Sequence, residues 1–127
     1  MKQYFQDVPI TIIEEDFFSF PNEEKYDLIV ANPPYAKFTV NGQRAAKNHT
    51  LSRDFLKKAI QLTKTNGYLV FILPDNWMSY ADRNDLPQIL TQYQILTLNI
   101  GEAKHWFPGV GSSFTYFVIK KRLLANF

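Results

Sequence analysis

The sequence has no cysteine, which excludes a disulfide scaffold, a zinc ribbon and any thiol nucleophile. It has no apolar stretch near the ~20 residues that a membrane helix needs, and no signal-peptide pattern opens it. Charge of neither sign dominates, because 14 Lys and Arg stand against 12 Asp and Glu, for a formal net charge of +2. We therefore expect a cytoplasmic protein with no membrane partner, in which any nucleic-acid site depends on local clusters of charge.

The residues that are present have the composition of one folded domain. Of the 127 residues, 46% are hydrophobic and 20% are charged, which excludes a disordered chain and leaves no room for a second domain of ordinary size. We expect residues 1–127 to form a single domain. Aromatic residues reach 16%, and such rings fill cores but also give a nucleobase a flat surface to stack on.

Short unbroken apolar runs predict strands that are buried on both faces, as in a parallel sheet. The three runs are Ile10–Ile13, Leu28–Ala31 and Tyr68–Leu73. A helical pattern covers Asp54–Thr65, which Ser52 can cap at its start and Gly67 can end.

The last third of the chain predicts a short helix and two more strands. Asp85–Gln92 has Asp85 as a candidate cap and Pro87 in its first turn. Ile95–Ile100 and Phe114–Ile119 read as strands, and the connection between them has no helical pattern, so an antiparallel pair is expected. The order of elements predicts an α/β fold, a three-layer sheet with an antiparallel edge.

The tetrapeptide Asn32-Pro33-Pro34-Tyr35 follows the second predicted strand, at the carboxyl end where open α/β sheets bind ligands. Pro34 restricts Pro33 to extended geometry and has no N–H to occupy the Pro33 carbonyl. The Asn32 side-chain oxygen and the Pro33 carbonyl can then form two fixed acceptors, which suit an amine with two N–H groups. The alternative is an ordinary turn, since Asn-Pro and Pro-Pro are common after strands.

With these residues the sequence resembles the gamma-type adenine-specific DNA methyltransferases, restriction-modification enzymes that use S-adenosylmethionine. The resemblance runs from about Ile10 to Arg122. Its ordered motifs are Asp16-Phe17, Tyr26 to Tyr35, Asp54 to Ala59, Gly67 to Pro74 with Trp77, and Trp106-Phe107-Pro108 before Phe114 to Lys121. It implies a Rossmann-like methyltransferase sheet.

The resemblance also implies the catalytic residues, namely Asn32, Pro33, Pro34 and Tyr35. An adenine flipped out of the duplex would present its N6 amine to the two acceptors and attack the sulfonium methyl group directly. Tyr35 and Phe107 would stack on the two faces of the base. Phe107 also fits a role in covering the edge of the sheet.

The same resemblance implies that Asp16, Phe17 and Phe55 bind the cofactor, with the two rings lining its adenine pocket. The alternatives are that Asp16 belongs to a solvated acidic turn and that Phe17 fills the core. Phe55 lies on the apolar face of its predicted helix, so a core role is equally open for it.

The stretch 36–53 contains cations and no acidic residue, and it follows the catalytic loop directly. Its candidate contacts to the backbone of double-stranded DNA are Lys37, Arg44, Lys47 and Arg53. An ordinary solvated loop is the alternative. His49 and His105 have no partners at the spacing of a metal site, so no metal is expected.

The sequence departs from this family at the start of the pattern. The glycine-rich loop and the acidic residue that hold the rest of the cofactor, which lie upstream of Ile10 in the family, are absent here. We therefore expect an incomplete sheet, the target-base half of a catalytic domain, which self-associates or binds a partner chain along its open edge. Two alternatives are a non-enzymatic remnant or sheet-completing subunit, and a methyltransferase of glutamine side chains or RNA.

Overall fold

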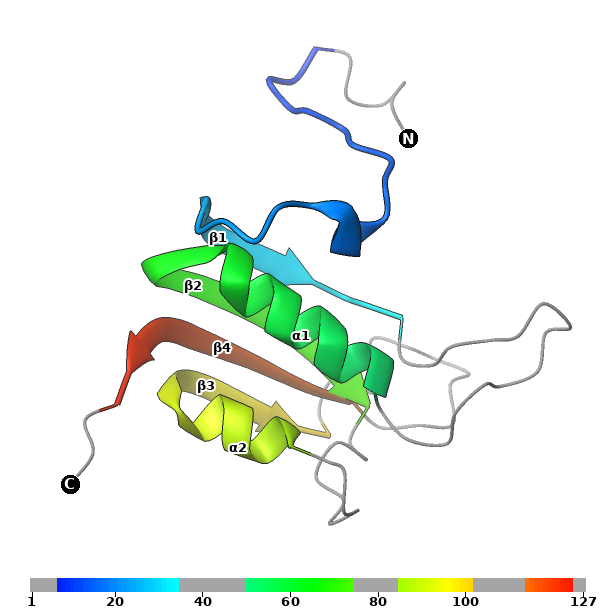
Figure 1. Cartoon of the computed structure of the whole chain (residues 1–127). Coiled ribbons are helices and arrows are strands. Elements are labelled where there is room, and N and C mark those ends of the chain that lie inside the picture. The colour runs from blue at the N-terminus through cyan, green and yellow to red at the C-terminus, as the bar shows by residue number, and fades with distance from the viewer. Residues whose placement is uncertain (1–6, 35–49, 75–84, 102–113, 125–127) are drawn as a thin grey trace, which may run out of the picture.

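The computed structural model describes residues 7–34, 50–74, 85–101 and 114–124 (Figure 1). In chain order the elements are the short 3₁₀ helix η2 (Phe17–Ser19), β1 (Tyr26–Ala31), α1 (Thr50–Leu62), β2 (Thr63–Pro74), α2 (Leu86–Thr91), β3 (Tyr93–Ile100) and β4 (Phe114–Leu123). The four strands form one sheet in the order β1-β2-β4-β3. The predicted mixed α/β class is confirmed.

Strand direction changes across the sheet, as the sequence predicts. β1 runs parallel to β2, whereas β4 is antiparallel to both β2 and β3. The predicted antiparallel pair of late strands is therefore confirmed. In the described chain β1 is an outer strand with a neighbour on one side only, so its carboxyl end and one edge are open.

The core lies between the sheet and both described helices, which cover the same face (Figure 1). Leu56, Ala59 and Ile60 of α1 are buried against alternate residues of the central strands, which include Phe71 and Phe117. The rings of Phe71 and Phe117 stack with their centroids 5.7 Å apart. Burying each such large side chain stabilises the fold by about 1.5–3 kcal/mol, so this face holds the domain together.

The opposite face of β1 is apolar and uncovered within the described ranges. Leu28 and Val30 alternate with the core-facing Ile29 and remain 56% and 71% exposed. Both described helices lie on the other side of the sheet, so two layers are seen rather than the three that the sequence predicts.

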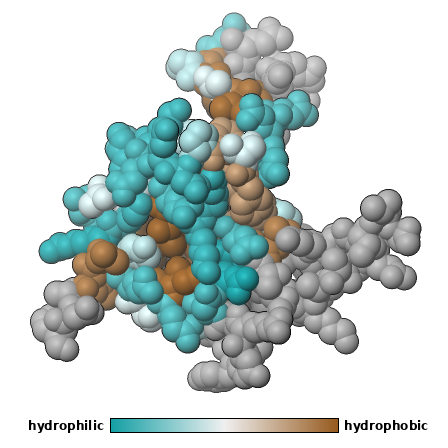
Figure 2. Space-filling view, viewed as in Figure 1, coloured by the Kyte–Doolittle hydropathy of each residue, from teal (hydrophilic) through white to brown (hydrophobic). Residues whose placement is uncertain are grey.

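Three local predictions are wrong. Ile10–Ile13 is not a strand: the segment is irregular and largely exposed, with the Ile10 amide bonded to the Val8 carbonyl at 2.7 Å. It extends away from β1, and no described strand lies beside it (Figure 1); in the space-filling view from the same side it projects at the top of the molecule (Figure 2). Ser52 is not a cap but a buried residue inside α1, because the helix begins at Thr50. Gly67 does not end the helix, since β2 already begins at Thr63.

A polar cluster joins the amino ends of β1 and β2 to β4. Lys121 donates to the Thr63 carbonyl at 2.8 Å and to Glu24 Oε1 at 3.1 Å, and Thr65 also donates to the Glu24 carboxylate. The hydrogen bond from the Lys121 ammonium is the main reason that the pKa of Glu24 lies below its ordinary value. These contacts hold the segment that leads into β1 against the end of the sheet opposite Asn32.

Candidate functional site

The residues Asn32-Pro33-Pro34 directly follow β1 without regular secondary structure, at the carboxyl end of the parallel pair β1 and β2. Asn32 and Pro34 are exposed, whereas Pro33 is buried. Ala31, just before this segment, pairs with Phe71 and packs against the core. The pairing and packing of Ala31 thus fix the start of this segment, while Asn32 remains exposed.

Four phenylalanine rings gather around η2 and the first turns of α1. Phe17 stacks on Phe55 with the centroids 5.4 Å apart and the planes only 9° from parallel. Phe18 contacts Phe55 at 4.6 Å in a tilted arrangement, and Phe20 lies 6.4 Å from Phe17. We call Phe17, Phe18, Phe20 and Phe55 the aromatic cluster.

Asp16 shapes the start of this cluster. It is the N-cap of η2, and its Oδ1 accepts a hydrogen bond from the Phe18 amide at 3.0 Å. The Ser19 hydroxyl donates to the Asp16 carbonyl at 2.6 Å. Because one carboxylate oxygen can satisfy the cap and the side chain is exposed, the other oxygen can accept a bond from a ligand.

Three of the sequence-predicted regions each place one residue against the core. Phe17, Ala31 and Phe55 all pack against the same core cluster, although they come from η2, the end of β1 and α1. The aromatic cluster therefore lies on the face of the sheet that the helices cover, and Asn32 follows the β1 residue that packs against the same core. Tyr35, Lys37, Arg44, Lys47 and Phe107 lie outside the described residues.

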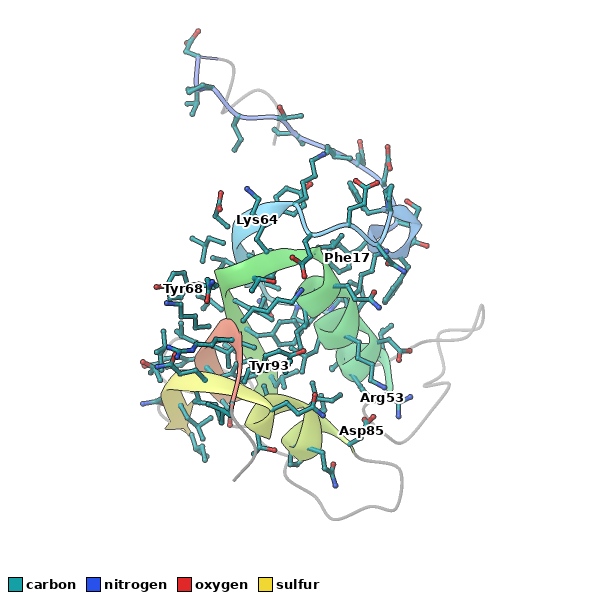
Figure 3. The ribbon with its side chains drawn as sticks, turned by 60° about the vertical axis from the view of Figure 1, so that its left-hand side comes forward. Phe17, Arg53, Lys64, Tyr68, Asp85 and Tyr93 are labelled. Atoms are coloured by element: carbon teal, nitrogen blue, oxygen red, sulfur yellow. The ribbon has the colours of Figure 1, made fainter. Side chains whose placement is uncertain are left out.

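Arg53, predicted to contact DNA, lies among carboxylates. Its Nε is 3.7 Å from Asp85 and 3.6 Å from Asp54, and Lys57 Nζ reaches Asp85 at 3.0 Å. Figure 3 shows Arg53 of α1 beside Asp85 at the start of α2. These ion pairs link the two helices and partly neutralise Arg53, so a phosphate contact there would have to compete with Asp85.

Sequence reasoning missed Lys58, which is only 7% exposed. Its Nζ donates to the Phe20 carbonyl and to Asn22 Oδ1, both in the segment between η2 and β1. The helical spacing could have indicated its burial. Lys58 follows Phe55 by three positions and precedes Leu62 by four, which places it on the apolar face of the helix. An open hollow of about 280 Å³ beside it is lined by Phe18, Asn22, Asp54, Lys57, Lys58 and Gln61.

Within the four described ranges, no three His, Asp or Glu side chains gather as metal ligands would. Nor is any helix found there both long and apolar enough to cross a membrane.

Comparison with known proteins shows which family the chain resembles. Residues 3–107 match the model of the Eco57I restriction-modification methylase family. A modification methylase, CviBIII of Paramecium bursaria Chlorella virus NC1A, is 31% identical over 116 residues, covering 87% of this chain and 30% of the relative. The type II methyltransferase M.TthHB8I of Thermus thermophilus is 27% identical over 95 residues, covering 61% of this chain and 22% of the relative.

A relative with another substrate also matches. The tRNA1(Val) (adenine(37)-N6)-methyltransferase of Glaesserella parasuis is 39% identical over 70 residues, covering 51% of this chain and 30% of the relative. The chain thus spans less than a third of the length of these curated relatives.

These matches place the chain among the adenine-specific methyltransferases of the N6 type. More particularly, the chain belongs to the Eco57I restriction-modification methylase family.

Proposed function

We propose that this chain forms the target-base half of an S-adenosylmethionine-dependent enzyme that methylates the N6 amine of adenine in DNA. The observation that carries the proposal is the position of Asn32-Pro33-Pro34 at the open carboxyl end of β1, with Asn32 exposed and Pro33 buried. Two oxygen acceptors on this segment fit the two hydrogens of an exocyclic amine.

The residues proposed to hold the cofactor have suitable chemistry. The aromatic cluster offers partly buried ring faces for an adenine, and the exposed Asp16 carboxylate offers an acceptor for an amine or hydroxyl hydrogen. Phe17 and Phe55 already stack on each other, so an adenine packs beside this pair rather than between its rings. Bound S-adenosylmethionine supplies the activated methyl group.

Asn32 and Pro33 act on the target amine. Their oxygens accept both N6 hydrogens and orient the nitrogen, which gains positive charge as it forms its new bond to carbon. Two preorganised carbonyl dipoles stabilise that charge, the cationic counterpart of an oxyanion hole. Pro34 restricts Pro33 to extended geometry, and the proposed role requires the Pro33 carbonyl oxygen to face the base.

DNA is favoured over tRNA by the extent of the matches. The family match covers residues 3–107, and the viral modification methylase aligns with 87% of the chain, against 51% for the tRNA enzyme. A tRNA adenine is the second candidate, because that enzyme has the higher identity. Parallel assays with unmethylated duplex DNA and with unmodified tRNA as methyl acceptors separate the two substrates.

Cofactor binding is expected to depend on Asp16. Asp16→Ala should weaken the affinity for S-adenosylmethionine about ten- to one-hundred-fold, because a hydrogen bond to a charged group is worth about 1.5–3 kcal/mol. Glu15→Ala, the neighbouring exposed carboxylate, should leave the affinity unchanged. Isothermal titration calorimetry measures both. Equal losses in the two variants would contradict the proposed role, and no binding by the wild type would mean that this chain alone does not form the pocket.

We also propose that the open edge of β1 is covered in solution by a second copy or by a partner chain. Leu28 and Val30 form an exposed apolar strip on a strand with unpaired backbone groups on one side, an arrangement that favours association. Sedimentation velocity of the purified chain should show dimers or larger species. Val30→Lys should shift the population toward monomer. Gln88→Lys, at an exposed position of α2, should leave the population unchanged. A monodisperse wild-type monomer would refute self-association.

A further inference from the structure

Lys58 is a buried cation on the apolar face of α1. The residue is 7% exposed, although lysine is rarely buried unless its charge is paired. Its neighbours on the helix, Lys57 and Gln61, are exposed, so burial is specific to this position. A side chain placed this way loses hydration that other contacts must replace.

The contacts that replace this hydration are neutral. Nζ donates to the Phe20 carbonyl and to Asn22 Oδ1, and none of the ion pairs in the described residues includes Lys58. The ammonium therefore has no counter-ion in this part of the chain. What it gains are two hydrogen bonds to a segment 36 to 38 residues earlier in the chain.

Those bonds fix the end of η2 to α1. Phe20 is the C-cap of η2, and its amide is bonded back to the Phe17 carbonyl at 3.4 Å. Phe55 lies one turn before Lys58 on the same helix and stacks on Phe17. Two kinds of contact thus join this segment to α1: the hydrogen bonds of Lys58 and the stacking of Phe17 on Phe55.

We propose that Lys58 is a positioning residue, which holds Asp16 and Phe17 against Phe55 through the Phe20 carbonyl and Asn22. The inference rests on the proposed function only in that these residues are the proposed cofactor site. Lys58 itself acts through the segment that it holds. Among the contacts that join this segment to α1, the ring contacts of Phe17 and Phe18 with Phe55 remain without the two hydrogen bonds, and the aromatic cluster is expected to lose its fixed geometry.

Lys58→Met tests this directly, because methionine keeps most of the apolar stem and removes the ammonium. The readout is the set of nuclear Overhauser cross-peaks between the Phe17 and Phe55 rings, compared with those between Phe71 and Phe117 in the core. We expect Lys58→Met to abolish the first set and to leave the second unchanged. A merely structural role would weaken both sets together, and persistence of the Phe17–Phe55 peaks would overturn the proposal.

Three further variants complete the experiment. Lys57→Met removes the adjacent exposed lysine and should leave both ring pairs intact. Lys58→Arg restores a donor and should restore the Phe17–Phe55 peaks at least in part. Asn22 is exposed, and Asn22→Ala removes one of the two acceptors. It should reduce the Phe17–Phe55 peaks about twofold or more and leave the Phe71–Phe117 peaks unchanged. If Lys58→Met fails to fold, unchanged peaks in Asn22→Ala overturn the proposal.

The cofactor is absent from this measurement, so the two proposals are tested separately. Suppose that Lys58→Met loses the ring contacts and that the wild type does not bind S-adenosylmethionine. The first result would support the positioning role of Lys58, and the second would refute cofactor binding by this chain. Where the wild type does bind, Lys58→Met should weaken the affinity about tenfold or more and Lys57→Met should not. Normal affinity in Lys58→Met would overturn the positioning role.

Discussion

Replacing Asn32 with alanine is expected to lower methyl transfer to adenine about 10²- to 10³-fold, the usual effect of removing one preorganised partner of the reacting group. The physical reason is that one of the two acceptors for the amine hydrogens disappears. The nitrogen is then less well oriented, and the positive charge that develops on it is less well stabilised. Since Asn32 is exposed and outside β1, the fold should not change.

The measurement is transfer of a radiolabelled methyl group from S-adenosylmethionine to unmethylated duplex DNA. Asn32→Asp keeps an acceptor oxygen at nearly the same place and should retain part of the activity. Gln88→Ala, which removes an exposed amide from α2, should retain all of it. Cofactor affinity should be the same in every variant. Full activity in Asn32→Ala would contradict the catalytic assignment of Asn32.

Replacing Gly67 with alanine is expected to lower the free energy of unfolding by about 1–3 kcal/mol, the usual cost of overpacking. A Cβ at Gly67 would lie 2.8 Å from the Lys64 carbonyl oxygen, 2.9 Å from the Asp27 carbonyl oxygen and 2.9 Å from Thr63 Cγ2. Two of these three atoms belong to the backbone, so the strain cannot be relieved by a side-chain rotation alone. Either β1 or the bend in β2 must move.

The register of the sheet explains why the backbones approach so closely. Tyr26 pairs with Thr63, but Leu28 pairs with Tyr68, so β2 has extra residues at this point. Asn66 lies in this irregular part of β2 and has a left-handed φ of 66°, and the next residue, Gly67, lies close to the Asp27 carbonyl. Only a residue without a side chain fits at this crossing.

Urea denaturation followed by circular dichroism measures the change in unfolding free energy. Asn66→Gly is the matched control: it alters the same bend, removes atoms instead of adding them, and suits the left-handed φ, so its effect should be within about 0.5 kcal/mol. An unfolding midpoint for Gly67→Ala equal to that of the wild type would mean that β1 is not held against β2 as described.

The sequence predicted those elements whose patterns are local. The apolar runs that became β1, the middle of β2, β3 and β4 are continuous and bounded by turn residues, so each was placed within a few residues. The helix over Asp54–Thr65 was also recognised from its spacing, although it begins at Thr50 and ends at Leu62. Its start was misplaced because Ser52 has the chemistry of a cap, whereas the structure buries it inside the helix.

Ile10–Ile13 shows where local pattern fails. Its residues have high strand propensity, but a strand needs a neighbour to receive its backbone hydrogen bonds. No described strand lies beside this segment, and it is irregular and exposed. The sequence pattern therefore indicates strand propensity, but it does not show whether a neighbouring strand is present to pair with.

The sequence by itself determined the chemistry proposed for the site, because Asn-Pro-Pro after an apolar strand offers two oxygen acceptors on a backbone that proline restricts. Only the tertiary structure decided what surrounds it. Asp85 reached Arg53, and Lys58 reached Phe20 and Asn22, across separations in sequence that no periodicity reports. Such contacts depend on how helices and strands pack, and that packing is fixed by the whole core rather than by any one segment.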